Sequence, residues 1–244
     1  MGDICSGADG LVKPMAKVFN GRTIVKENSM SRRVASIVLL GGLVTAFAGC
    51  KSAYYATWEK LGWAKRDILV DRVKDAKEEQ EGAKKQFQTA LEQFQALTGF
   101  QGGELEAKYK KLNKEYESCE SRAADVRKRI AAVDTVANDL FVEWNKELAE
   151  YDNAELKRSS EQKLRETKDR YNQMYAAMKN AESKMDPVLR TFKTQVLFLK
   201  HNLNAQAIAS LQTQVKGISG DVDKLIRDMD AAIKEANAFI GQMK

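Results

Sequence analysis

Apolar side chains recur every seven residues through most of this chain, in steps that alternate between four and three residues. Between residues 105 and 144 this seam contains no charged side chain. The spacing keeps one narrow apolar stripe facing a neighbouring helix, which is typical of coiled coils and helical bundles. Glycine and proline, which interrupt helices, are sparse after residue 62, and Ala, Lys, Glu, Gln and Leu dominate. The repeat therefore predicts an all-α fold.

Turn-forming residues divide the seam into four segments, and we expect helices over 53–98, 104–151, 154–200 and 205–243. At 1.5 Å per residue, each spans about 60–70 Å. Short connections favour antiparallel neighbours, so we predict an elongated up-down-up-down four-helix bundle with both ends of the helical part at one end. Two antiparallel hairpins that pack only through a dimer are the alternative, and a homo-oligomer stays open.

Four positions inside these segments stand out. Gln80 is the one polar residue in the seam of the first segment. Pro187 either starts a new helix after Asp186 or kinks a continuous one, and the unbroken seam favours the kink. Gly217 and Gly220 weaken the last helix by about 1 kcal/mol each relative to alanine.

A different pattern precedes the helices. Met30-Ser-Arg-Arg is followed by the apolar run VASIVLLGGLVTAFAG and then by Cys50. A positive start, an apolar run of this length and small residues at its end are typical of a secretory signal peptide, here 30–49. The run is short for a membrane-spanning helix, which needs about 20 residues. We expect cleavage between Gly49 and Cys50, and we interpret residues 1–29 as a leader from a misassigned upstream start codon.

The cysteine after Ala48-Gly49 resembles the lipobox of bacterial lipoproteins, although Phe47 stands where such boxes usually carry Leu. The resemblance implies a mature chain, 50–244, that is lipidated at Cys50 and faces the periplasm. Lys51 follows the cysteine, whereas Asp there favours inner-membrane retention in such lipoproteins. The resemblance therefore implies an outer-membrane location.

Charge and cysteine content bear on two further questions: whether the chain binds nucleic acid and whether it forms a disulfide. The chain has 40 basic and 34 acidic residues, of which 6 and 3 lie before Cys50, so the mature part carries a net charge of only +3. We therefore expect no nucleic-acid partner. Cys119 falls on the seam, so we expect a buried core residue rather than an interchain disulfide.

Candidate sites are few. Tyr54, Tyr55, Trp58 and Trp63 lie close to Cys50 among basic residues, which predicts contact with a membrane interface. The alternative is that these rings close the membrane-proximal end of the bundle. His201 is the only histidine, so we expect a turn residue and no metal or cofactor site. We interpret the carboxylates Glu78, Glu79 and Glu81 as a solvated face, and the following seam residues as core: Tyr109, Tyr116, Tyr171, Met174, Met178 and Met185.

Three stretches carry a family resemblance: YYATWEKLGWAKRDILVDRV (54–73), LKHNLNAQAIASL (199–211) and DVDKLIRDMDAAIKEANAFI (221–240). They look like the proteobacterial lipoproteins catalogued as domain of unknown function 2959. The resemblance agrees with an envelope location and a helical fold, and it implies no activity or catalytic residue.

These observations favour a membrane-anchored scaffold, spacer or adaptor with a protein partner in the bacterial envelope. The alternative is a module that binds lipid or cell-wall polymer through the aromatic-basic segment beside the anchor. We expect no enzymatic activity, because no catalytic motif rises above background.

Overall fold

The computed structural model describes residues 64–99 and 104–243. All of them belong to the second of two compact units of the chain, Tyr54–Lys244. The described residues form α3 (Lys65–Thr98), α4 (Leu105–Glu147), α5 (Ala154–His201), α6 (Ala205–Met243) and a 3-10 turn, η1 (Leu148–Glu150). No strand occurs among them, which confirms the predicted all-α fold.

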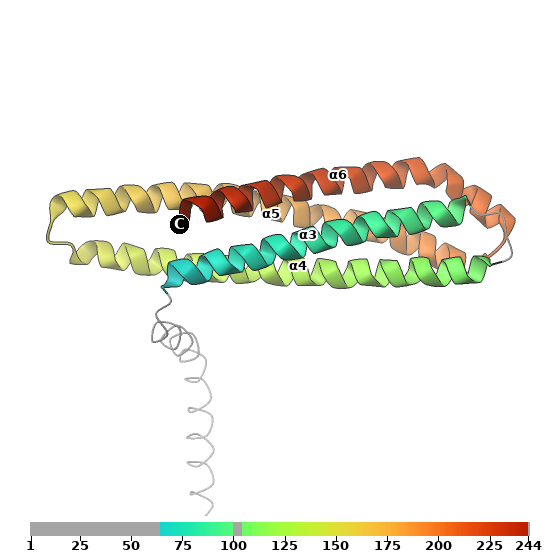
Figure 1. Ribbon diagram of the computed structural model, residues 1–244, viewed down its shortest axis with the longest axis horizontal. Helices are drawn as coiled ribbons and strands as arrows, with labels where there is room; N and C mark the ends of the chain where they lie inside the picture. The colour runs from blue at the N-terminus through green and yellow to red at the C-terminus, as the bar shows by residue number, and fades with distance from the viewer. Residues whose placement is uncertain (1–63, 100–103, 244) are drawn as a thin grey trace, which may run out of the picture. The chain divides into compact units, whose positions relative to one another are not determined.

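The four helices pack as an antiparallel bundle (Figure 1). Both α3 and α5 contact α4 and α6, so each helix has two close neighbours within the same chain. The chain alone thus forms the four-helix arrangement, and the dimer-dependent hairpins are not needed to build it. As predicted, α3 begins and α6 ends at the same end of the bundle (Figure 1).

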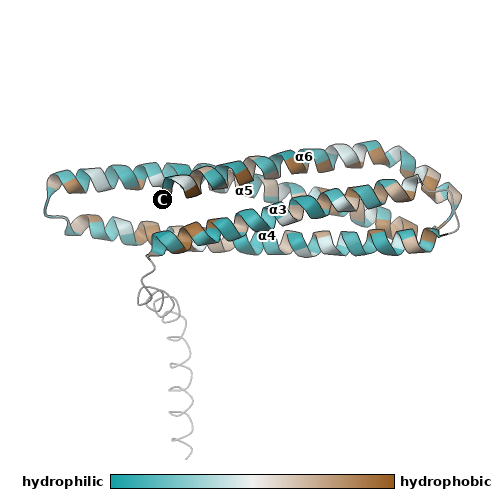
Figure 2. Ribbon diagram, viewed as in Figure 1, coloured by the Kyte–Doolittle hydropathy of each residue, from teal (hydrophilic) through white to brown (hydrophobic). Residues whose placement is uncertain are grey.

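Burial follows the heptad seam, and the hydropathy colouring shows apolar residues recurring along each helix (Figure 2). The exceptions among the predicted seam residues lie mostly toward helix ends. Tyr151 is exposed, and these are half-buried: Leu105, Tyr109, Trp144, Thr167, Leu203, Val215 and Met243. The core is also wider than the seam, because each helix faces two neighbours rather than one. The added buried residues include Ile68, Val70, Leu91, Val136, Phe141, Leu189, Ala207 and Ile240.

Asparagine caps begin the last two helices. The Asn153 side chain accepts hydrogen bonds from the backbone N–H groups of Glu155 and Leu156, at 2.9 and 3.0 Å. Asn204, the predicted N-cap, accepts one from Ala207 at 2.9 Å. Such caps satisfy donors that have no partner within the helix, and each stabilises the helix by about 1 kcal/mol.

Two predicted weak points leave the helices continuous. The helix α5 passes through Pro187 without interruption, as the unbroken seam favoured. Likewise α6 is one helix through Gly217 and Gly220, so no cap restarts it there. In contrast, α4 ends at Glu147, four residues before the predicted 151, and the chain tightens into η1 before Tyr151 becomes extended.

At one end of the bundle only two of the described helices are present. The α3 residue Lys65 forms an ion pair with Glu143 of α4, which places the start of α3 near the end of α4. Beyond that level α4, η1 and the first turns of α5 continue without the described parts of α3 or α6 beside them (Figure 1). We call residues 144–162 the hairpin extension. Within the described ranges, no helix has the length and apolar content to cross a membrane.

Candidate functional site

The residues predicted to carry the anchor lie outside the described residues. Cleavage, lipidation and membrane contact at these positions therefore remain predictions. The residues are Gly49, Cys50, Tyr54, Tyr55, Trp58 and Trp63.

Cys119 lies in the core, where the seam placed it. Its side chain is fully buried and forms no disulfide. Burial raises the pKa of the thiol to about 12, and the nearby Glu115 carboxylate adds to the shift. A thiol with so high a pKa is protonated at neutral pH, so Cys119 is not an activated nucleophile.

An aromatic cluster surrounds Tyr171 on α5. The Tyr171 ring stacks on Tyr175 at 5.5 Å between centroids and meets Phe141 and Phe239 edge-on, at 5.5 and 6.4 Å. Its hydroxyl donates a 2.9 Å hydrogen bond to Asp134 of α4. Burial, followed by the Asp134 contact, raises the pKa of Tyr171 well above its usual value. The cluster thus ties α4, α5 and α6 together and is core, as the seam predicted.

The other tyrosine and methionine residues that the sequence placed in the seam are also core or core-packed. Met174, Met178 and Met185 have no exposed surface, and Tyr116 is buried. Burial raises the pKa of Tyr116 above its usual value, with a further contribution from Glu120. Tyr109 is half-buried and packs against the same core. Side chains fill this space, so it offers no binding cavity.

His201 and the acidic run sit on the surface. His201 is exposed as the last residue of α5. Glu79 forms a 2.7 Å ion pair with Arg122 of α4, whereas Glu78 is exposed. No cluster of three or more His, Cys, Asp or Glu side chains suited to a metal occurs among the described residues.

Gln80 is the buried polar residue of the seam. Its side chain has no exposed surface, and neither the amide nitrogen nor the amide oxygen has a hydrogen-bond partner. A buried amide without partners destabilises the folded state by about 1–3 kcal/mol. The polar entry in the α3 seam is therefore a weak point in the bundle core.

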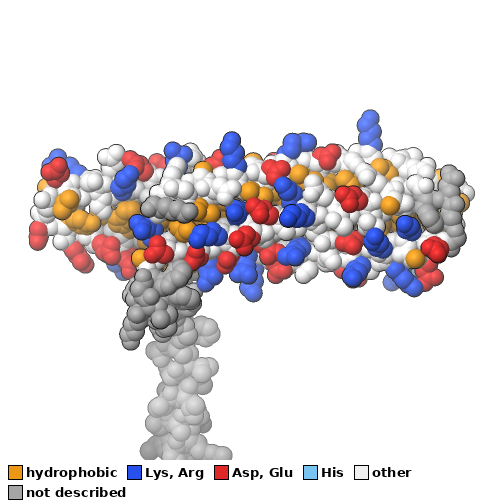
Figure 3. Space-filling view, viewed as in Figure 1, with side chains coloured by type: hydrophobic (Ala, Val, Ile, Leu, Met, Phe, Trp, Pro, Cys, Tyr) orange, Lys and Arg blue, Asp and Glu red, His pale blue; other side chains and the backbone are white. Residues whose placement is uncertain are grey.

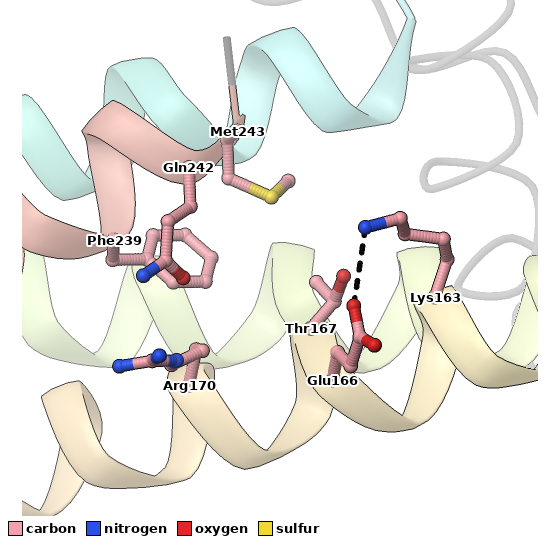
Figure 4. Close-up of a pocket in the computed structure, with 7 residues that line it drawn as sticks. All are labelled: Lys163, Glu166, Thr167, Arg170, Phe239, Gln242 and Met243. Atoms are coloured by element: carbon pink, nitrogen blue, oxygen red, sulfur yellow. Dashed lines mark hydrogen bonds and ion pairs between the residues drawn. The ribbon is translucent and has the colours of Figure 1, made fainter.

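A pocket of about 290 Å³ lies where the end of α6 meets α5 (Figure 4). The Lys163 ammonium forms a 3.1 Å ion pair with Glu166. Hydrogen bonds from Gln162, and then from Lys163, lower the pKa of the Glu166 carboxyl. Opposite charges on the α5 wall partly neutralise each other, so the pocket has no dominant charge. Its lining residues are Lys163, Glu166, Thr167, Arg170, Phe239, Gln242 and Met243.

A second pocket, of about 260 Å³, lies between α4 and α5. Within it Arg127 of α4 forms an ion pair with Asp186 of α5. Arg190 and Lys193 add positive charge, and Leu189 adds an apolar wall. Charged side chains of both signs are interspersed over the visible face of the bundle (Figure 3). The pocket thus resembles the rest of the mixed surface.

Large exposed apolar side chains are a more distinctive feature of the surface than either pocket. Leu197 and Phe198 are adjacent on α5, and 52% and 39% of their surfaces are exposed. We call them the distal pair. They lie in the last two turns of α5, beside the turn into α6 and opposite the hairpin extension (Figure 1). The heptad pattern does not single them out as a site, although an apolar pair that falls off the buried positions Val196 and Leu199 is a usable signal.

Similarity to known proteins covers the whole of the described bundle. A family model described as protein of unknown function (DUF2959) matches residues 54–243. No curated protein matches the chain. No solved structure matches it either.

Proposed function

Because this chain belongs to the family of proteins of unknown function DUF2959, we propose its function from its own residues: a lipid-anchored scaffold or adaptor of the bacterial envelope. The anchor is Cys50, in the outer membrane, and the helical bundle extends into the periplasm to reach a protein partner. The proposal assigns the chain no catalytic step.

The N-terminal pattern supports the anchor. A signal-type segment ends at Cys50, which precedes the first residue of α3 by 15 residues. An acyl chain on this cysteine, with further chains as in similar lipoproteins, holds a protein stably at a bilayer. The tether then leads to the end of the bundle at which α3 begins.

The distal pair carries the proposal. Because α3 and α5 run in the same direction, the end of α5 is remote from the beginning of α3. The 48 residues of α5 span about 70 Å. Leu197 and Phe198 therefore present exposed apolar surface at the far end of a long rod. Large exposed apolar patches mark protein-interaction sites, and we assign the partner contact to this pair because it lies at the end of the bundle remote from the anchor.

The shifted ionisable core groups support a structural role. Burial raises the pKa values of Tyr116, Cys119 and Tyr171, which favours their neutral forms. Nucleophiles and general bases require the opposite shift of a thiol or a phenol. These buried groups therefore suit packing better than chemistry.

One observation favours the alternative of a module that binds lipid or an anionic cell-wall polymer. The helix α5 carries 11 basic and 6 acidic residues, an excess of positive charge. Lys and Arg near a bilayer are attracted to anionic head groups. In this alternative α5 acts together with the aromatic-basic segment beside the anchor.

In-cell crosslinking tests the scaffold. A photo-crosslinking residue placed at Leu197 in the full chain is expected to give a complex of defined mass, because this exposed side chain contacts the partner. The same residue at Asp169, an exposed polar position on the same helix, is the control and is expected to give none. Equal crosslinking from both positions would indicate non-specific contact and contradict a binding site at the distal pair.

Two further variants complete this test. Replacing both Leu197 and Phe198 with Asp is expected to abolish the complex, now captured with a chemical crosslinker, without unfolding the bundle, because both side chains are exposed. Cys50→Ser is expected to release the protein from the membrane fraction. A solitary, uncrosslinked monomer in cells would contradict the scaffold, and a co-purifying lipid or polymer in native mass spectrometry would favour the alternative.

A further inference from the structure

The hairpin extension leaves apolar side chains without a covering helix among the described residues. Leu156 and Tyr151 expose 59% and 39% of their surfaces, and Trp144 is half-buried. Figure 3 shows hydrophobic side chains between the charged ones at this end of the bundle. Two helices cannot enclose such a strip by themselves, whereas a third helix laid along it does.

The chain that immediately precedes α3 has the pattern to cover this strip. Steps of four and three residues upstream from Ile68 reach Lys65, Leu61, Trp58 and Tyr54. Ile68 is buried, and Lys65 faces α4 through its ion pair with Glu143. We propose that α3 continues upstream to Tyr54 and that its Tyr54, Trp58 and Leu61 side chains dock on the hairpin extension.

The register with α4 agrees with this occupant. Because α3 and α4 are antiparallel, moving upstream from Lys65 corresponds to moving downstream from Glu143. Leu61, one step of four residues before Lys65, then comes level with position 147, beside Leu148. Trp58, one step further, comes level with position 150, beside Tyr151.

The alignment of α3 with α5 independently places Trp58 at the same level of the hairpin extension. Phe94 of α3 meets Phe192 of α5 edge-on, with 6.4 Å between centroids. These two helices run in the same direction, so Trp58 and Leu156, which lie equally far upstream of that pair, are level with each other. Trp58 therefore falls between the two exposed apolar side chains of the hairpin extension, Tyr151 and Leu156.

Two further features agree with a helix over residues 54–64: where the family match begins, and which residues lie on the other faces of that helix. The family match begins at residue 54, which is where the proposed helix begins. Lys60 falls on the same row as Asp67 and Lys74, whose side chains are 48% and 45% exposed, so the outer face of the proposed helix is polar. Gly62 costs the helix about 1 kcal/mol relative to alanine. Tyr55 lies two heptads before the buried Leu69, so it continues the seam of α3 and faces the core side.

The docked helix also shortens the tether between Cys50 and the bundle. Only this step rests on the proposed function, because it requires the lipid anchor. If Cys50 is lipidated, only residues 51–53 separate the anchor from the helix, a reach of about 13 Å rather than about 50 Å for a chain extended to Lys65. The bundle is then held directly against the membrane.

Cysteine crosslinking tests the docking in the full chain. The W58C/Y151C pair, treated with a short thiol crosslinker, is expected to give a linked peptide in mass spectrometry. The control pair K60C/Y151C is expected to give none, because Lys60 lies on the outer face. Equal linkage of both pairs, or no linkage of W58C/Y151C in a protein with a native helical circular dichroism spectrum, would overturn the docking.

A second measurement tests the docking if the double-cysteine variant fails to fold. Trp58→Ala is expected to lower the Tm by roughly 5–10 °C, whereas Lys60→Ala leaves it unchanged. Equal shifts in the two variants would also overturn the docking. Lipidation of Cys50 is read separately from the mass of the N-terminal peptide, so failure of the anchor is distinguishable from failure of the docking.

Discussion

The Tyr171 hydroxyl donates a 2.9 Å hydrogen bond to Oδ1 of Asp134 and so joins α5 to α4 inside the aromatic cluster. The ring is buried, whereas Asp134 is half-buried. The Tyr171 side chain thus packs through its apolar ring and also donates a hydrogen bond to a charged carboxylate. Such a hydrogen bond is stronger than one between neutral groups.

Tyr171→Phe keeps the ring and removes only this bond. We expect the free energy of unfolding to fall by about 1–2 kcal/mol, because the Asp134 carboxylate loses its donor. Urea unfolding measures the change. Tyr151→Phe, at an exposed ring, serves as the control and is expected to leave stability unchanged.

Gln80→Leu is expected to stabilise the bundle by about 1–3 kcal/mol, because it removes a buried amide that has no partner. The matched control is Gln86→Leu, which removes a 2.7 Å hydrogen bond to Glu115 and is expected to destabilise. Thermal unfolding of both variants measures the difference. A loss of stability in Gln80→Leu would show that the amide has a partner in solution.

The raised pKa of Cys119 predicts that the folded protein loses stability at alkaline pH. Its pKa is about 12 in the folded state, against an ordinary value of 9.0. Above pH 9 the unfolded chain loses this proton while the folded chain keeps it, so stability falls by about 1.4 kcal/mol per pH unit as pH rises toward 12. Urea unfolding between about pH 8 and pH 10 measures the slope. Cys119→Ala is expected to flatten it, and an unchanged slope would contradict the assignment.

Gly217→Ala and Gly220→Ala are each expected to stabilise α6 by about 1 kcal/mol. Both positions lie inside the helix, and an added Cβ meets nothing within 4 Å at either one. The gain is measured by thermal unfolding. Gly99→Ala, which lies beyond the last residue of α3, is the control and is expected to gain less.

Much of the fold was readable because a heptad repeat is local information. The bounds of α6 agree with those expected, and the Asn204 cap lies where the turn signal placed it. The seam also located Cys119 in the core. The end of α4 was less readable, because the seam continues past Glu147 although the chain there tightens into η1.

The candidate site was less readable, because exposure depends on what lies beside a residue. Tyr151 continued the seam but is exposed, since neither the described part of α3 nor that of α6 reaches its level.

The amino-acid sequence by itself determined that long helices form and which stripe of each is apolar, because the spacing of side chains along a helix is set by its pitch. Only the tertiary structure decided which helices become neighbours and where each one ends relative to the others. The Lys84–Asp230 ion pair joins residues 146 positions apart at 2.6 Å, and no local pattern predicts it. The hairpin extension arises in the same way, from the unequal lengths and the relative register of the packed helices.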